Sequence, residues 1–221
     1  MFVYIVTDTL ENYRKSKSWY DVRDTLEGLA EDTGLVVHYK QVSPSLLEAL
    51  KPWAICHSGC STRFEDYDVL QQTEYRDVIR TSAIPQLGLC GGHQLVATFF
   101  GSRIGPMRRL RADEPDLAPY RAGYFKEWGM YPVRILKRDP LFKGFGKTIR
   151  VQEYHFCEVK KLGPELELLA STRDCRVQAF RHRDKPVYGT QFHPESATDT
   201  YPDGRKVLKN FFALARAYRK D

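Results

Sequence analysis

Apolar and polar residues alternate along this chain on two length scales. Short apolar runs are separated by longer stretches in which apolar residues recur at helical spacing. This order is typical of βαβ units, in which helices cover a mostly parallel sheet. The short runs predict strands at Phe2–Thr7, Leu35–Tyr39, Trp53–His57, Ile84–Leu89, Tyr131–Leu136, Thr148–Val151, Glu167–Ser171, Val177–Arg181 and Val187–Gln191.

The longer stretches predict helices on both faces of that sheet. Ser43-Pro44 supplies an N-cap and a first-turn proline for one of them, and Gly101 is placed to end another. The sequence therefore predicts a doubly wound α/β fold, and residues 1–221 are expected to form one domain. The predicted helices cover Trp19–Ala30, Leu46–Leu50, His93–Phe100 and Val207–Tyr218.

The segment Gly105–Gly123 interrupts this regular pattern. It is rich in proline, arginine and acidic residues and predicts an inserted loop. Long ordered loops often carry function, so the insertion either contacts substrate or partner or is a solvated surface without a task.

Composition narrows the class of protein further. The chain is 42% hydrophobic and 28% charged, and its 34 basic and 28 acidic residues give a net charge of +6. These values exclude collagen-like, coiled-coil and disordered chains. Apolar runs stay well below the roughly 18 residues of a membrane span, and no nucleic-acid motif accompanies the basic residues. Five cysteines without paired spacing indicate a reducing compartment. We therefore expect a cytoplasmic protein that binds neither membranes nor nucleic acid.

The first candidate for chemistry is Gly88-Leu89-Cys90-Gly91-Gly92, between a predicted strand and a predicted helix. Gly-x-Cys-x-Gly at such a junction is the thiol form of the nucleophile elbow. The turn strains the nucleophile's backbone and packs chain closely on both sides, so flanking glycines leave the required room. The helix N-terminus favours thiolate, which matters because a free cysteine has a pKa of about 8.5. A buried cysteine in a glycine-rich turn is the alternative interpretation.

The second candidate is His193-Pro194-Glu195, directly after the last predicted strand. In an extended chain, residues two positions apart face the same side, and Pro194 favours an extended His193. The carboxylate could then select the histidine tautomer and stabilise its cation, as the third group of a catalytic triad does. Alone, the pattern also fits a surface turn, but chance is a poor explanation for its combination with the cysteine elbow.

Together, Leu87-Gly-Leu-Cys-Gly-Gly-His-Gln94 and Gly189-Thr-Gln-Phe-His-Pro-Glu195 resemble the motifs of the class I (triad-type) glutamine amidotransferases. The resemblance covers nearly the whole chain. It implies a flavodoxin-like fold and a glutaminase that hydrolyses the side-chain amide of glutamine. Further segments resemble the family's pre-elbow strand and loop, its Glu-aromatic-Gly turn and its substrate loop: Trp53–Asp68, Glu127-Trp128-Gly129 and Glu153-Tyr-His-Phe156.

The resemblance also implies a role for individual residues. Cys90 is the expected nucleophile, His193 the base and acid, and Glu195 the group that orients His193. The backbone N–H of Gly91 is one expected oxyanion donor. Gln94 is expected in the glutamine pocket, and the backbone of Tyr154, His155 and Phe156 is expected to help hold the substrate's α-amino and α-carboxylate groups.

The loop before the elbow departs from the family pattern. Members usually have Ser-Gly-Gly-Pro there, whereas this chain has Ser58-Gly59-Cys60-Ser61. The second oxyanion donor would be the N–H of Cys60, with that of Gly59 as the alternative. A non-glycine residue serves only if the local backbone angles suit it, so the oxyanion geometry is in question.

Three functions are compatible with these residues. A glutaminase subunit would pass ammonia to a synthetase on another polypeptide, since the chain has no phosphate-binding glycine loop of its own. A free-standing γ-glutamyl hydrolase or peptidase would use the same triad without a partner. A catalytically silent regulatory subunit would keep only the fold. We expect no cofactor and no metal, because Cys56-His57-x-x-Cys60 supplies at most three ligands at a strand end.

Overall fold

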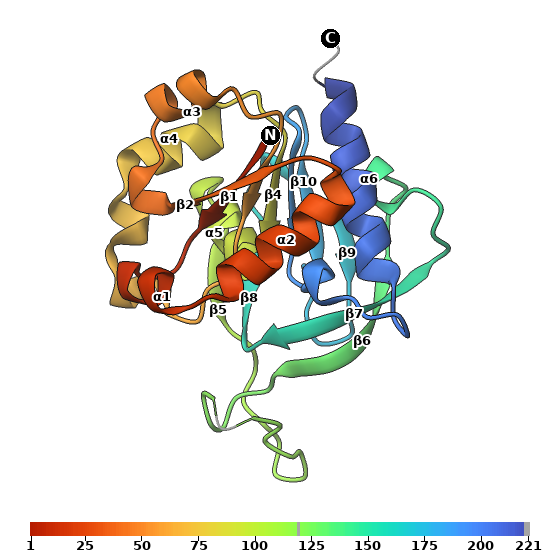
Figure 1. Ribbon diagram of the computed structural model, residues 1–221. Helices are drawn as coiled ribbons and strands as arrows, with labels where there is room; N and C mark the ends of the chain where they lie inside the picture. The colour runs from red at the N-terminus through yellow and green to blue at the C-terminus, as the bar shows by residue number, and fades with distance from the viewer. Residues whose placement is uncertain (119, 219–221) are drawn as a thin grey trace.

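Side chains of β1 (Phe2–Val6) show how the sheet separates two hydrophobic cores. The first, third and fifth residues of this strand pack into one core, and the second and fourth pack into the other. All five are buried, as expected for a central strand covered on both faces. The computed structural model describes residues 1–118 and 120–218, and Figure 1 shows helices on both sides of this sheet.

The main sheet has nine strands in the order β2-β1-β3-β4-β11-β10-β9-β6-β7. The first five are parallel to one another, and each later neighbour is antiparallel to the one before it. Two further strands, β5 and β8, form a small antiparallel sheet. The bounds are β2 Gly34–His38, β3 Ile55–His57, β4 Gln86–Leu89, β5 Arg103–Pro106, β6 Glu127–Ile135, β7 Thr148–His155, β8 Cys157–Lys161, β9 Leu166–Ser171, β10 Ala179–His182 and β11 Val187–Thr190.

Helices α2 and α6 cover one face of the main sheet, and α3, α4 and α5 cover the other (Figure 1). Phe211 and Phe212 of α6 are almost fully buried, and each contributes roughly 1.5–3 kcal/mol through apolar burial. The hydroxyl of Ser43 accepts from Leu46 N–H at 3.1 Å and caps α3 as expected. The bounds are α1 Leu10–Lys15, α2 Ser18–Ala30, α3 Pro44–Leu50, α4 Thr73–Thr81, α5 Gly91–Phe99 and α6 Asp203–Tyr218.

The predicted fold class is confirmed, and every predicted strand and helix is present. The sequence analysis missed α1, α4, β5 and β8 and the full length of the β6–β7 hairpin. It was also wrong about where the insertion begins, because Gly105 and Pro106 belong to β5 and pair with β8. These residues lack the apolar alternation of a strand, and only the pairing with β8 fixes their conformation. We call residues 107–126 the arginine-rich segment; it projects beyond the sheet in Figure 1.

Four neighbouring parallel strands, β1, β3, β4 and β11, end at one edge of the sheet. Ligands bind at this edge in open α/β sheets. All the candidate residues of the elbow, the pre-elbow loop and the His-Pro-Glu pattern directly follow one of these strands. Within the described ranges, the helices are too short or too polar to cross a lipid bilayer.

Candidate active site

Cys90 lies at the junction of β4 and α5, in a strained backbone conformation. Its φ is +48° and its ψ is −103°, and α5 begins at the next residue. Its N–H donates to the carbonyl of Thr190 at 2.8 Å, which ties the elbow to the end of β11. The thiol-bearing residue is 7% exposed and faces the pocket.

The glycines on either side of Cys90 are required by close packing. A Cβ on Gly88 would lie 2.6 Å from the carbonyl group of Gly92, and a Cβ on Gly92 would lie 2.5 Å from the carbonyl oxygen of His57. Real side chains do not tolerate such distances to backbone atoms. The steric reason for the glycine spacing around the nucleophile is therefore confirmed.

His193 and Glu195 form the expected pair. The imidazole Nδ1 lies 2.7 Å from Oε1 of Glu195, and the His193 N–H donates to the carbonyl of Gln152 at 2.8 Å. The backbone between them is a short 3-10 turn over Pro194–Ser196 and not the extended chain we predicted. Proline at the first position of such a turn is favourable, and the turn brings the two side chains together equally well.

Cys90 and His193 meet across Gly59. A Cβ on Gly59 would lie 3.3 Å from Cε1 of His193 and 3.6 Å from Cβ of Cys90, so any side chain there would press on both residues. Burial acts to lower the pKa of His193, but the negative charges of Cys90 and Glu195 outweigh it and raise the pKa well above the ordinary value. The geometry thus favours a protonated imidazole beside a thiolate.

The pre-elbow loop places Cys60 against Gly91. The backbone nitrogen of Cys60 lies 2.7 Å, and its sulfur 2.5 Å, from the position that a Cβ on Gly91 would occupy. The amide of Cys60 therefore lies beside the first residue of α5, where the sequence predicts an oxyanion donor. Burial first, and then the charge of Cys90, raise the pKa of the Cys60 thiol, so this second sulfur stays protonated.

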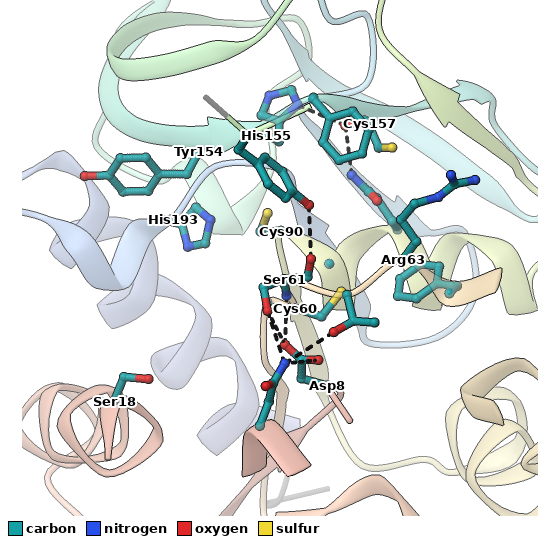
Figure 2. A pocket seen from close by; sticks show the side chains of 18 of the residues that line it. Asp8, Ser18, Cys60, Ser61, Arg63, Cys90, Tyr154, His155, Cys157 and His193 are labelled. Carbon is teal, nitrogen blue, oxygen red and sulfur yellow. Dashed lines mark hydrogen bonds between the residues drawn. The ribbon is translucent and has the colours of Figure 1, made fainter. Parts of the chain in front are cut away.

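A cavity of about 830 Å³ opens above Cys90, and Gln94, Tyr154, His155 and Phe156 all line it (Figure 2). The side-chain amide of Gln94 donates to the carbonyl of Cys157 at 2.8 Å and to Oε1 of Gln191 at 2.9 Å. Gln191 in turn donates to the sulfur of Cys90 at 3.6 Å. Sequence reasoning missed Gln191, although its place two residues before His193 was a usable signal.

The three residues of the substrate loop differ in what their side chains do. The Tyr154 ring packs on His193 with 5.6 Å between ring centroids, and Phe156 packs under Tyr120 at 5.2 Å. His155 instead points into a buried acidic cluster, with Nε2 at 3.0 Å from Glu127 and 3.2 Å from Glu153. Its side chain therefore stabilises the loop, and the backbone of the loop faces the cavity.

Burial acts to lower the pKa of His155, but hydrogen bonds to Glu127 and Glu153 raise it to about 10. Glu127, His155 and Cys175 also bring three potential metal ligands within 4.8 Å of one another. A metal would need a neutral imidazole and a thiolate there. His155 holds its proton, and burial raises the pKa of Cys175, so the chemistry of this donor set does not suit a metal ion.

The arginine-rich segment reaches the mouth of the cavity through Tyr120. The Tyr120 hydroxyl donates to the carbonyl of Ser61 at 3.0 Å, and its ring covers Phe156. Arg108 stacks on Phe125 and pairs with Glu114, so part of the positive charge is neutralised within the segment itself. The predicted proximity of the insertion to the site is therefore seen for Tyr120.

Comparisons with known proteins agree with this geometry. The family model of the class-I glutamine amidotransferases matches residues 31–215. One of the subunits of the glutamine-hydrolysing GMP synthase of Pyrococcus abyssi is 33% identical over 177 residues, 76% of this chain and 78% of the relative. The counterpart from Pyrococcus furiosus is 34% identical over 165 residues, 75% and 77% of the two chains.

Solved structures share the same architecture. A crystal structure of a GMP synthase subunit from Thermoplasma acidophilum superposes with a TM-score of 0.75 at 25% identity and covers 100% of this chain and 96% of its own. A glutamine amidotransferase from Thermotoga maritima gives a TM-score of 0.66 at 15% identity, covering 100% and 94%, and supports the fold alone.

Proposed function

The chain belongs to the class-I glutamine amidotransferase family, and on that premise we propose that Cys90, His193 and Glu195 form its catalytic triad. The observation that carries the proposal is the elbow cysteine on the floor of a cavity, beside a histidine whose Nδ1 is 2.7 Å from a carboxylate. Cys90 would be the nucleophile, His193 the base and acid, and Glu195 the group that holds the imidazole tautomer.

The reaction proceeds in two stages. The Cys90 thiolate attacks the side-chain carbonyl of glutamine, and the N–H groups of Gly91 and Cys60 stabilise the oxyanion that develops on its oxygen. His193 gives its proton to the departing nitrogen, which leaves as ammonia. Water, deprotonated by His193, then hydrolyses the γ-glutamyl thioester to glutamate and returns the thiol to its starting state.

The remainder of the cavity would hold the amino-acid end of glutamine. We assign this role to the backbone of Tyr154, His155 and Phe156, together with Gln94. The buried ion pairs of His155 with Glu127 and Glu153 fix the loop that carries those backbone groups.

The relatives are named as subunits of a glutamine-hydrolysing GMP synthase, so we propose that this chain supplies ammonia to a synthetase on a separate polypeptide. Its five cysteines, which all lie within the described residues, are unpaired, and this fits a reducing, cytoplasmic location. The arginine-rich segment, inserted in the single domain, lies close enough to the cavity mouth to take part in docking.

Ammonia release from glutamine by the purified chain tests the triad. We expect Cys90→Ala to abolish turnover and a glutamine-like diazoketone to modify Cys90. Cys175→Ser is the matched control, because this buried thiol lies outside the cavity lining and its weak bond to the Val177 carbonyl can be kept by a hydroxyl.

Two results would count against the proposal. Turnover that survives Cys90→Ala would remove the nucleophile, and modification of another cysteine would relocate it. Adding a candidate synthetase then separates a glutaminase subunit from a free-standing γ-glutamyl hydrolase, since a subunit should be stimulated and a hydrolase should not.

A further inference from the structure

The oxyanion loop of residues 58–61 is held by the last residues of β1 and the turn after it. The N–H of Thr7 donates to the Ser58 hydroxyl at 2.9 Å, and the Thr7 hydroxyl donates to the Ser58 carbonyl at 3.0 Å. One turn further, Asp8 Oδ2 accepts from the Ser61 N–H at 2.8 Å and from the Ser61 hydroxyl at 2.9 Å. Both ends of the loop are therefore attached to the same segment of chain.

These contacts determine where the Cys60 amide points. The carbonyl of Gly59 accepts from the Ser58 hydroxyl at 2.7 Å, on the side of β1. In a trans peptide the carbonyl and the following N–H point in opposite directions, so the Cys60 N–H faces away from β1. The Cys60 nitrogen lies against Gly91, so its N–H is aimed toward the start of α5 and the nucleophile.

The peptide on the other side of Cys60 is controlled by Asp8 alone among the described contacts. The N–H of that peptide belongs to Ser61 and donates to the Asp8 carboxylate. If that bond were lost, the Cys60–Ser61 peptide could rotate and carry the Cys60 amide with it. The loop contains no proline to restrict such a rotation, because Ser61 stands where the family pattern has one.

We propose that Asp8 is a positioning residue of the oxyanion hole, which acts by holding the Ser61 N–H so that the Cys60 N–H stays aimed at the reacting carbonyl. The proposal rests on the proposed glutaminase function. Asp8 does not itself touch the reacting atoms: its other oxygen, Oδ1, accepts from the Thr9 N–H at 2.7 Å and from the Asn12 amide at 3.1 Å. Figure 2 shows Asp8 below Ser61 and Cys60, with these bonds around it.

Asp8 is also suited to this task by its charge state. Burial acts to raise its pKa, but hydrogen bonds from Ser61, Thr62 and Thr9 outweigh burial and lower the pKa below the ordinary value. The side chain is 1% exposed and ionised across the range in which an amidotransferase is assayed. It therefore presents a fixed acceptor, and hydrogen bonds to an ionised acceptor are stronger than neutral ones.

The test separates attack on a carbonyl from reactivity of the thiol. We expect Asp8→Ala to lower kcat for glutamine roughly 10²-fold, the usual effect of losing one oxyanion donor, with KM changed less than about threefold. Alkylation of Cys90 by iodoacetamide should keep its wild-type rate within about twofold, because displacement of iodide develops no oxyanion. The matched control is Asp32→Asn, a carboxylate bound to Trp53 away from the cavity lining, which should leave kcat unchanged.

Two outcomes would overturn the proposal: an unchanged kcat in Asp8→Ala, or a parallel fall in kcat and alkylation rate, which would indicate general damage to the Cys90–His193 pair. If Asp8→Ala does not fold, Asp8→Asn keeps an oxygen for the Ser61 N–H, and a selective loss of about tenfold in kcat is expected. Failure of the wild type to hydrolyse glutamine would refute the proposed function instead, so the two failures are distinguishable.

Discussion

Replacing His155 by glutamine should destabilise the fold far more than an ordinary surface change. Its imidazolium lies 3.0 Å from Glu127 and 3.2 Å from Glu153, whose side chains are 1% and 0% exposed. Glutamine keeps a donor but removes the positive charge between two buried acids. Removing one partner of a buried ion pair costs about 3–5 kcal/mol, which lowers the Tm of a chain of this size by on the order of 10 °C.

Urea and thermal unfolding at neutral pH measure this loss. The control is His182→Gln, because His182 also faces a glutamate, Glu165, at 3.4 Å, but that carboxylate is 44% exposed. Its loss should cost less than about 1 kcal/mol. Equal losses in the two variants, or a loss below about 1 kcal/mol in His155→Gln, would refute the assignment of a structural cation to His155.

The same pair of variants has a pH signature. Because folding raises the pKa of His155 from 6.5 to about 10, the folded chain holds this proton more tightly than the unfolded chain. Its contribution to stability is therefore complete below about pH 6.5 and is lost as the pH rises toward 10. The unfolding free energy of the wild type should fall over this interval. His155→Gln should show a flatter profile, whereas His182→Gln should keep the wild-type slope.

Two further predictions concern the catalytic elements. His193→Ala should cost as much glutamine turnover as loss of the nucleophile, whereas Glu195→Gln should retain roughly 10–100-fold more, because an orienting group costs less to lose than a base; steady-state kinetics decide, and near wild-type turnover in His193→Ala would exclude it from the mechanism. Gly92→Ala puts a Cβ at 2.5 Å from the His57 carbonyl oxygen and should lose about 1–3 kcal/mol of stability, whereas Gly28→Ala in α2 meets no atom within 4 Å and should not destabilise; equal unfolding midpoints would contradict this.

The parts of the site that could be predicted are those determined by neighbours in the chain. The glycine spacing around Cys90 and the contact of His193 with Glu195 follow from local sterics, and both are seen. Asp8 and Gln191 could not be found in this way, because their partners are 53 and 101 residues distant along the chain. Their roles depend on which strands become neighbours in the sheet.

The elements that the sequence analysis missed have the same explanation. Helix α4 has few apolar residues, and its short buried face is visible only once α3 and α5 pack beside it. Strand β6 begins at Glu127, an acid that breaks the apolar pattern and is tolerated because His155 lies opposite it in the hairpin. A buried charge is legible as part of a strand only when its counter-charge is known.

The pairing of β4 with β11 has a consequence for how the protein is made. It joins Gln86 to Val187, so the strand that presents Cys90 acquires its neighbour only after most of the chain has left the ribosome. His193 arrives with that neighbour. During synthesis the thiol therefore exists for a long time without the imidazole that would activate it, and long-range pairing of this kind is the slow part of folding. The nascent chain cannot consume glutamine, and the onset of hydrolysis reports that the last strand of the parallel half has taken its place.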